Sequence, residues 1–236
     1  MQFQVSEKIR LNEHFLLEKR GFKNLLILFP GFAFDYKIFS FLDLPFDYLY
    51  PTSLVTMDTV DSLKKLLPSI KDNFSKPYLL GWSLGANLAL SLYKELPNAF
   101  RRLFLISIKE QYNKNEITEL ILKLRDDPKN MLKDFYRRCF LGKKLFFNWF
   151  KKNLEPDYLK NFSHLMLIRQ LTYLENDYVY IPEVSNITIF YGKKDIIVPL
   201  SSIPEIPSKV KTFIFQNASH IPFLENDFIE KFLKGI

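Results

Sequence analysis

The sequence GWSLG at 81–85 constrains the fold of this 236-residue chain more than any other feature. An apolar run at 77–82 ends just before the serine, and residues 84–96 have the spacing of a helix. A serine between a strand and a helix, with glycine two positions away on each side, predicts a sharp turn that exposes the hydroxyl group. We therefore expect Ser83 at the carboxyl end of a buried strand.

Strand and helix patterns alternate along most of the chain, which predicts an α/β fold: a mostly parallel, twisted sheet flanked by helices. The predicted strands lie at 24–29, 46–50, 77–82, 102–108, 186–191 and 211–215. The predicted helices lie at 59–73 (with Asp58 as N-cap), 84–96 and 223–233. Residues 109–182 instead favour helices only, so we predict a core at 1–108 and 183–236 and an inserted helical cap. Residues 109–182 are called the cap segment below.

Composition narrows the class of protein. Apolar residues make up 47% of the chain, enough for a sizeable core, yet no run approaches the roughly 18 residues of a membrane span. The single cysteine, Cys139, excludes an internal disulfide framework. Residues 1–13 lack the basic and apolar pattern of a leader. We expect a cytoplasmic, monomeric protein without a membrane span.

The net charge of +7 is concentrated in the cap segment. Residues 129–152 hold eight basic side chains and one acidic one, Asp134, so the rest of the chain is neutral. Such a local field favours an acidic partner, although a charge run is also a common solubility feature. Interleaved aromatic residues could suggest single-stranded nucleic acid. The motif around Ser83 makes nucleic acid the less favoured interpretation.

A serine nucleophile needs a base, and the chain has three histidines. His14 precedes the first buried strand, and His164 lies inside the cap segment. His220 follows the last predicted strand, in a loop at the same sheet edge as Ser83. The order serine, acid, histidine along the chain is typical of this strand-turn-serine arrangement. We therefore predict His220 as the general base.

The acid is expected after the strand at 186–191. Asp195 is the first carboxylate there, and it could orient His220 and stabilise the imidazolium ion. A turn aspartate is the plainer alternative, and Glu205 is the nearest competitor. The oxyanion hole would use the backbone N–H groups of Leu84, after the nucleophile, and of Phe32, after the first core strand.

Four segments resemble the pimeloyl-acyl-carrier-protein methyl ester esterases of biotin synthesis, which have the α/β-hydrolase fold. They are LLGWSLGANLAL at 79–90, TIFYGKKDIIVP at 188–199, FQNASHIPFLEN at 215–226 and, in the cap segment, LRDDPKNMLKDFYRRCFLG at 124–142. The resemblance implies a serine carboxylesterase that converts pimeloyl-carrier methyl ester to pimeloyl-carrier and methanol. It implies no metal and no organic cofactor.

The resemblance also implies site residues. The triad would be Ser83, Asp195 and His220, with Phe32 and Leu84 as the oxyanion hole. Further residues expected to bind substrate are Trp82, Phe135, Tyr136, Arg137, Arg138 and Cys139. The strongly acidic carrier protein would dock on basic residues of the cap segment, for which we name Lys129, Lys133, Arg137, Arg138, Lys143 and Lys144.

Two alternatives remain open from the sequence. One is another esterase, thioesterase or acyltransferase on small acyl substrates, because a triad does not decide whether water or another acceptor clears the acyl-enzyme. The other is a non-catalytic binding protein on the hydrolase fold. Such proteins usually lose a triad member, whereas all three are in place here.

Overall fold

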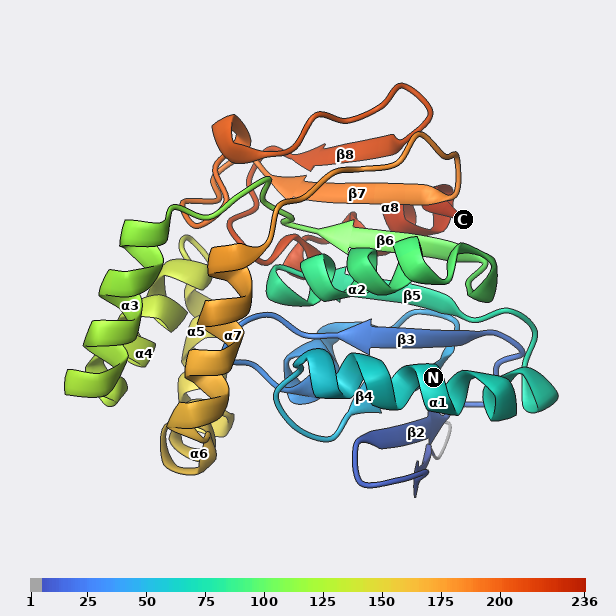
Figure 1. The fold of residues 1–236 in the computed structure, drawn as a ribbon, viewed down its shortest axis with the longest axis horizontal. Coiled ribbons are helices and arrows are strands. Elements are labelled where there is room, and N and C mark those ends of the chain that lie inside the picture. The colour runs from blue at the N-terminus through green and yellow to red at the C-terminus, as the bar shows by residue number, and fades with distance from the viewer. Residues whose placement is uncertain (1–5) are drawn as a thin grey trace.

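The computed structural model describes residues 6–236, which form one eight-stranded sheet with helices on both faces (Figure 1). The strand order is β1-β2-β4-β3-β5-β6-β7-β8. The strands span Glu7–Arg10, Phe15–Lys19, Leu25–Phe29, Asp47–Pro51, Tyr78–Trp82, Arg102–Ile106, Ile187–Gly192 and Lys211–Phe215. All neighbours from β4 to β8 run parallel, whereas β1 and β2 pair antiparallel at one edge.

The central strands form because their sequences are short, uninterrupted apolar runs. Every residue of β3, β5 and β7 is buried, as expected for strands of a parallel sheet covered on both faces. Because parallel strands all point the same way, the loops after β3, β5, β6, β7 and β8 emerge at one edge of the sheet. The predicted α/β fold is confirmed, and these loops carry the candidate site.

Helices α1 (Met57–Asn73) and α2 (Leu84–Glu95) cover the near face of the sheet in Figure 1, and α8 (Phe228–Gly235) covers the far face. Two predicted boundaries were wrong. The N-cap of α1 is Thr56 rather than Asp58, and the Thr56 amide donates to Oγ1 of Thr59 at 3.1 Å. The final helix begins at Phe228, not at residue 223, because a separate 3₁₀ turn at Pro222–Leu224 precedes it.

Two further strands were missed by the sequence analysis. β1 and β2 lie in a stretch that reads as polar, because β1 is an exposed edge strand and only two residues of β2 are buried. The register pairs Leu17 with Leu49 of β4, so this hairpin extends the sheet. The strand β4 also includes Pro51, one residue beyond the predicted end at position 50.

Five helices lie between β6 and β7, beyond the carboxyl ends of the strands (Figure 1). They are α3 (Lys114–Asp126), α4 (Pro128–Cys139), α5 (Lys144–Asn153), α6 (Glu155–Asn161) and α7 (His164–Asn176). An antiparallel bridge between Gln111 and Tyr178 joins the two ends of this insertion. The remaining 3₁₀ turns are Tyr36–Phe41, Pro97–Ala99 and Leu200–Ser202.

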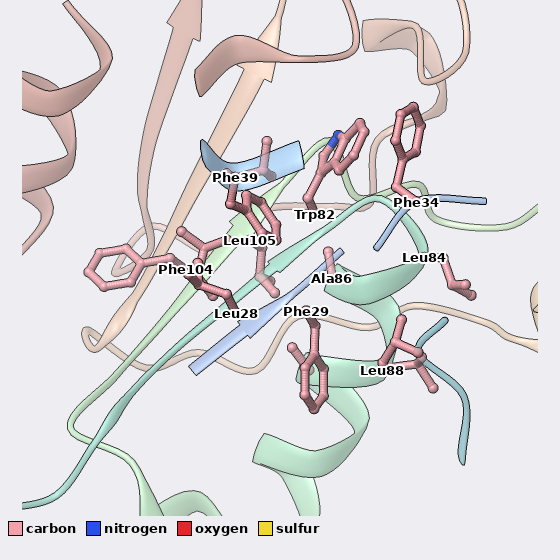
Figure 2. Close-up of a cluster of buried hydrophobic side chains, with 14 of the residues drawn as sticks. Leu28, Phe29, Phe34, Phe39, Trp82, Leu84, Ala86, Leu88, Phe104 and Leu105 are labelled. Atoms are coloured by element: carbon pink, nitrogen blue, oxygen red, sulfur yellow. The ribbon is translucent and has the colours of Figure 1, made fainter. Parts of the chain in front are cut away.

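A cluster of aromatic side chains continues from the sheet into these helices. Phe34, fully buried in the loop after β3, packs on Trp82 at a ring-centroid distance of 4.9 Å (Figure 2). Its other neighbours belong to the insertion: Tyr136 at 5.1 Å and Phe150 at 5.8 Å. Large buried aromatic rings contribute strongly to stability, so Phe34 links the two parts through one apolar core.

Candidate active site

Ser83 lies between the last residue of β5 and the first residue of α2, in a left-handed conformation with φ of 54°. The turn is tight because its flanking glycines leave no space: a Cβ at Gly81 would overlap the backbone of Gly85, and one at Gly85 would overlap the Phe29 carbonyl group. The Ser83 amide donates to the Ile106 carbonyl at 2.8 Å. This conformation is the one expected of a nucleophile elbow, and it places Ser83 at the positive end of α2.

His220 and Asp195 form a buried pair at the same edge of the sheet. Nδ1 of His220 lies 2.8 Å from Oδ2 of Asp195, and both side chains are almost completely buried. Oδ1 of Asp195 accepts hydrogen bonds from the amides of Ile197 and Val198, both at 2.8 Å. Burial would raise the pKa of Asp195, but His220 and these amides hold it below the usual value. The arrangement fixes the imidazole orientation.

The backbone of the histidine loop is anchored separately. The indole Nε1 of Trp82 donates to the His220 carbonyl at 2.8 Å, and Ser219 donates to the Cys139 carbonyl of α4 at 2.9 Å. The second ring nitrogen of His220, Nε2, is buried and has no hydrogen-bond partner within residues 6–236. It is the atom that a general base would use.

A cavity of about 690 Å³ opens on Ser83 between the sheet edge and helices α3, α4 and α7. Its apolar walls include Phe32, Leu120, Met131, Phe135 and Leu171. Charged residues of both signs also line it, with carboxylates in the majority: Lys109, Lys123 and Arg138 against Glu116, Glu119, Asp126, Asp127 and Asp134. The apolar part of the lining suits a ligand with an apolar body.

Tyr112 lines the same cavity as Ser83, and the sequence analysis did not identify it. Burial raises the pKa of Tyr112, while the nearby Ser83 side chain opposes that rise. Tyr112 is half-buried and packs against the hydrophobic core. A tyrosine in a polar linker gives no sequence signal for this position.

The predicted oxyanion donors lie close to the nucleophile. A Cβ at Gly31 would approach Cβ of Ser83 to 3.2 Å, so the loop after β3 passes directly beside the elbow. In the part of the chain that the structure describes, no protein group accepts a hydrogen bond from the amides of Phe32 or Leu84. Both are thus available for an oxyanion, as the chemistry requires.

The structure separates the other predicted substrate residues into two groups. Phe135 and Arg138 line the cavity. Tyr136, Cys139 and Trp82 are fully buried and do not line it, and Arg137 points to solvent and pairs with Asp134 at 2.5 Å. Tyr136 instead donates to the carbonyl of Ala33, in the loop after β3, at 2.9 Å.

The proposed docking lysines are not equivalent. Lys129, Lys133 and Lys144 are exposed, as is Arg138. Lys143 is only 17% exposed and pairs with Glu225 of the core at 2.6 Å. The other two histidines lie apart from the site: His14 faces Glu13, and His164 is exposed at the start of α7. Glu205 is exposed as well.

Residues 6–236 contain neither a candidate metal site nor a candidate membrane-spanning helix. No group of three or more histidine, cysteine or acidic side chains in this range could hold a metal ion. Nor does this range contain a helix with the length and apolar character needed to cross a membrane.

Comparison with known proteins gives one close match in sequence and many in fold. Over 179 residues the chain is 30% identical to the pimeloyl-[acyl-carrier protein] methyl ester esterase of Wigglesworthia glossinidia brevipalpis. The alignment covers 65% of this chain and 66% of that protein. The expected resemblance is therefore confirmed over about two thirds of each chain. No protein-family model matches the chain.

Solved structures extend the similarity of fold to nearly the whole chain. The deep-sea metagenome α/β-hydrolase MGS-M2 matches with a TM-score of 0.75 at 13% identity, covering 97% of each chain. An esterase from Exiguobacterium antarcticum matches with 0.73 at 16% identity, over 93% of this chain and 94% of that one. The enol-lactonase of Burkholderia xenovorans matches with 0.73 at 13% identity, over 94% and 95%.

Proposed function

The chain belongs to the α/β-hydrolase superfamily, and on that premise we propose that it is a serine carboxylesterase acting on the methyl ester of a pimeloyl-carrier protein in biotin synthesis. The observation that carries the proposal is the buried His220–Asp195 pair at the sheet edge where Ser83 occupies a strained elbow. The sequence relative supplies the substrate class, since its name states the ester on which that protein acts.

In the proposed reaction, Ser83 Oγ attacks the ester carbonyl carbon while Nε2 of His220 accepts the hydroxyl proton. The carbonyl oxygen becomes an oxyanion that receives hydrogen bonds from the amides of Phe32 and Leu84. His220 then donates its proton to the leaving methanol. Water, deprotonated by the same nitrogen, attacks the acyl-enzyme and releases the acid. Asp195 keeps Nδ1 protonated and stabilises the imidazolium ion in both halves.

The cavity supports an acyl substrate, and residues 109–182 serve in this proposal as its cap. Apolar side chains of α3, α4 and α7 face the space above Ser83, where an acyl chain would lie. The carboxylates of the cavity lining do not favour an acidic carrier at the mouth itself. We therefore place the carrier on the adjacent surface of α4 and α5, where Lys129, Lys133 and Lys144 are exposed.

The test compares the parent protein with Ser83→Ala on pimeloyl-carrier methyl ester, following release of pimeloyl-carrier over a range of salt concentrations. Hydrolysis by the parent alone, weakening as salt rises, is the expected result. Loss of rate in a Lys129→Glu, Lys133→Glu, Lys144→Glu triple variant, with p-nitrophenyl butyrate hydrolysis unchanged, would place docking on α4 and α5.

Other results would reject parts of the proposal. Ser83-dependent turnover of p-nitrophenyl butyrate without turnover of the carrier ester would reject the biotin-pathway assignment and keep the serine hydrolase. Faster cleavage of the matching thioester than of the oxygen ester would favour a thioesterase. A cytoplasmic location, a monomeric state and the lack of a nucleic-acid partner remain predictions of this proposal.

A further inference from the structure

We propose that Gln170 and Tyr136 are positioning residues that hold the oxyanion loop in its active shape from the cap segment. The inference rests on the proposed function, because it assigns the Phe32 amide to the oxyanion. It concerns the turn at 31–34, in which the Phe34 amide donates to the Gly31 carbonyl at 3.2 Å. Ala33 occupies the third position of this turn with φ of 57°.

That conformation is unfavourable for alanine. A turn with positive φ at its third residue normally has glycine or asparagine there, because a Cβ crowds the backbone. Ala33 must therefore be held by its surroundings, as is common for strained residues at functional sites. The turn itself supplies one hydrogen bond, from the Phe34 N–H to the Gly31 carbonyl, which leaves the N–H and the C=O of Ala33 itself without partners inside the turn.

Side chains of the cap segment bind both the N–H and the C=O of Ala33. Oε1 of Gln170, in α7, accepts from the Ala33 amide at 3.1 Å. The hydroxyl group of Tyr136, in α4, donates to the Ala33 carbonyl at 2.9 Å. All three residues are at most 1% exposed, so water does not compete for these groups. The N–H and the C=O of Ala33 are thus bound from two different helices, α7 and α4.

The orientation of the Gln170 amide is also determined. Its Nε2 donates to the Val55 carbonyl at 2.9 Å, and the reversed orientation would place an NH₂ group against the Ala33 amide and the carbonyl oxygen against that of Val55. Gln170 therefore bridges two core loops from one position on α7. A side chain that only attached the cap segment to the core would not need to bind Ala33, the strained residue next to the proposed oxyanion donor Phe32.

Tyr158 offers a matched comparison. Like Tyr136 it is a buried tyrosine of the aromatic cluster, and its hydroxyl group donates to a core residue, Asp35, at 2.5 Å. The Asp35 carboxylate also accepts a hydrogen bond from the Lys37 amide and pairs with the Lys37 ammonium group. The position of Asp35 therefore does not depend on Tyr158 alone. Tyr158→Phe removes a tie between cap and core without touching the peptide groups of Ala33.

The experiment measures kcat and KM for p-nitrophenyl butyrate in the parent, Gln170→Met, Tyr136→Phe and Tyr158→Phe, together with inhibition by a phenylboronic acid. The boronate forms a tetrahedral adduct on Ser83 whose oxygen occupies the oxyanion hole. Loss of a whole oxyanion donor costs about 10²–10³ in kcat, so a displaced one should cost roughly 10- to 100-fold. We expect that loss in Gln170→Met and Tyr136→Phe, with KM little changed and boronate affinity reduced in parallel.

Tyr158→Phe should retain parental kcat and boronate affinity. An equal loss of kcat in Tyr158→Phe would overturn the inference. So would a parental kcat in Gln170→Met and Tyr136→Phe. If Gln170→Met fails to fold, as judged by circular dichroism, the shape-conserving Tyr136→Phe decides. Failure of the proposed function would be seen separately, as parent activity that Ser83→Ala does not remove.

Discussion

In the sheet, strands β3, β5 and β7 bury every one of their residues, whereas α3 of the cap segment buries two of thirteen and α5 buries one of ten. The sheet is stabilised by apolar packing that has little directional preference. The cap segment relies in addition on directed contacts to the core. They include Gln170 with Ala33, Tyr158 with Asp35, Ser219 with Cys139, and Lys143 with Glu225.

This difference indicates separate roles for the two regions. The core supplies a rigid edge where strained residues can be held, and the directed contacts set where the cap segment sits above that edge. Changes in the core should alter stability or the chemical step. Changes in the contacts between the regions should have smaller effects on stability and act mainly through geometry. The predictions below test this division, beginning with the largest effect.

The largest effect is expected for Asp195→Asn, which would lower kcat by about 10⁴-fold because the amide cannot hold His220 in the required tautomer. Steady-state hydrolysis of p-nitrophenyl butyrate measures it. Asp47→Asn is the control, since Asp47 is also a buried core aspartate that accepts backbone amides, from Arg20 and Phe22. It should lower the melting temperature and leave kcat unchanged. A parental kcat in Asp195→Asn would show that Asp195 is not the acid of the site.

A second comparison uses two fully buried phenylalanines, Phe104 in β6 and Phe150 in α5. Each change to alanine should reduce the free energy of unfolding by about 3–5 kcal/mol through the lost packing and the cavity left behind. For a chain of this size the melting temperature should fall by roughly 6–20 °C. Differential scanning calorimetry should show a single transition in both variants, because Phe150 packs on Phe34 of the core.

Two calorimetric transitions in Phe150→Ala would contradict the expectation that the cap segment and the sheet unfold together. They would show that the cap segment unfolds separately and that the directed contacts, not the shared aromatic cluster, attach it to the sheet. Loss of activity at the lower transition would then identify the cap segment as the labile part.

A third, smaller effect is expected at the ion pair between Lys143 and Glu225, which joins the two regions and is less than one fifth exposed. Lys143→Met should reduce the free energy of unfolding by about 1–2 kcal/mol, because Glu225 is left partly buried without its partner. Lys64→Met is the matched change in the core, where the pair with Glu95 is more exposed and should contribute less than about 1 kcal/mol. Urea denaturation of both variants measures the difference. Equal values would mean that burial does not distinguish the two pairs.

The smallest effect concerns pH. Because His220 and two amides hold the pKa of Asp195 below its usual value of about 3.9, its ionised form stabilises the folded state. That contribution is present above the unfolded pKa and is lost as the pH falls through the lower folded pKa. Urea midpoints of the parent and Asp195→Asn should therefore differ at pH 7 and converge below pH 4. A constant difference would assign the stabilisation to packing instead of ionisation.

Much of the fold was predictable because it depends on local patterns. The apolar runs of β3, β5 and β7 were recognisable because a strand buried on both faces has no polar positions. Ser83 follows β5, Asp195 follows β7 and His220 follows β8, so their common edge followed from the parallel topology. The structure brings His220 and Asp195 together, and it places Ser83 at the same edge.

The missed features depend on contacts between distant segments. The edge strands β1 and β2 have little buried surface and thus little apolar pattern. Gln170 gave one usable signal, a polar residue on the buried face of α7 beside Leu167, Leu171 and Leu174, but nothing in the sequence names Ala33 as its partner 137 residues away. The family segment predicts Tyr136 as a substrate contact, but a comparison by position does not give the direction of each side chain on α4, and so it does not identify the Ala33 carbonyl as the partner of Tyr136.

The two tryptophans of the chain happen to report on the two regions separately. Trp82 is fully buried against Phe34 and donates its indole N–H to the His220 carbonyl, whereas Trp149 of α5 is partly exposed and packs on Phe41 of the core at 4.5 Å. Indole emission depends on the polarity around the ring. Trp149→Phe leaves a fluorophore in contact with the histidine loop, and Trp82→Phe leaves one at the seam between α5 and the core. Stopped-flow emission from the two variants would therefore follow the histidine loop and the seam between α5 and the core as independent optical signals.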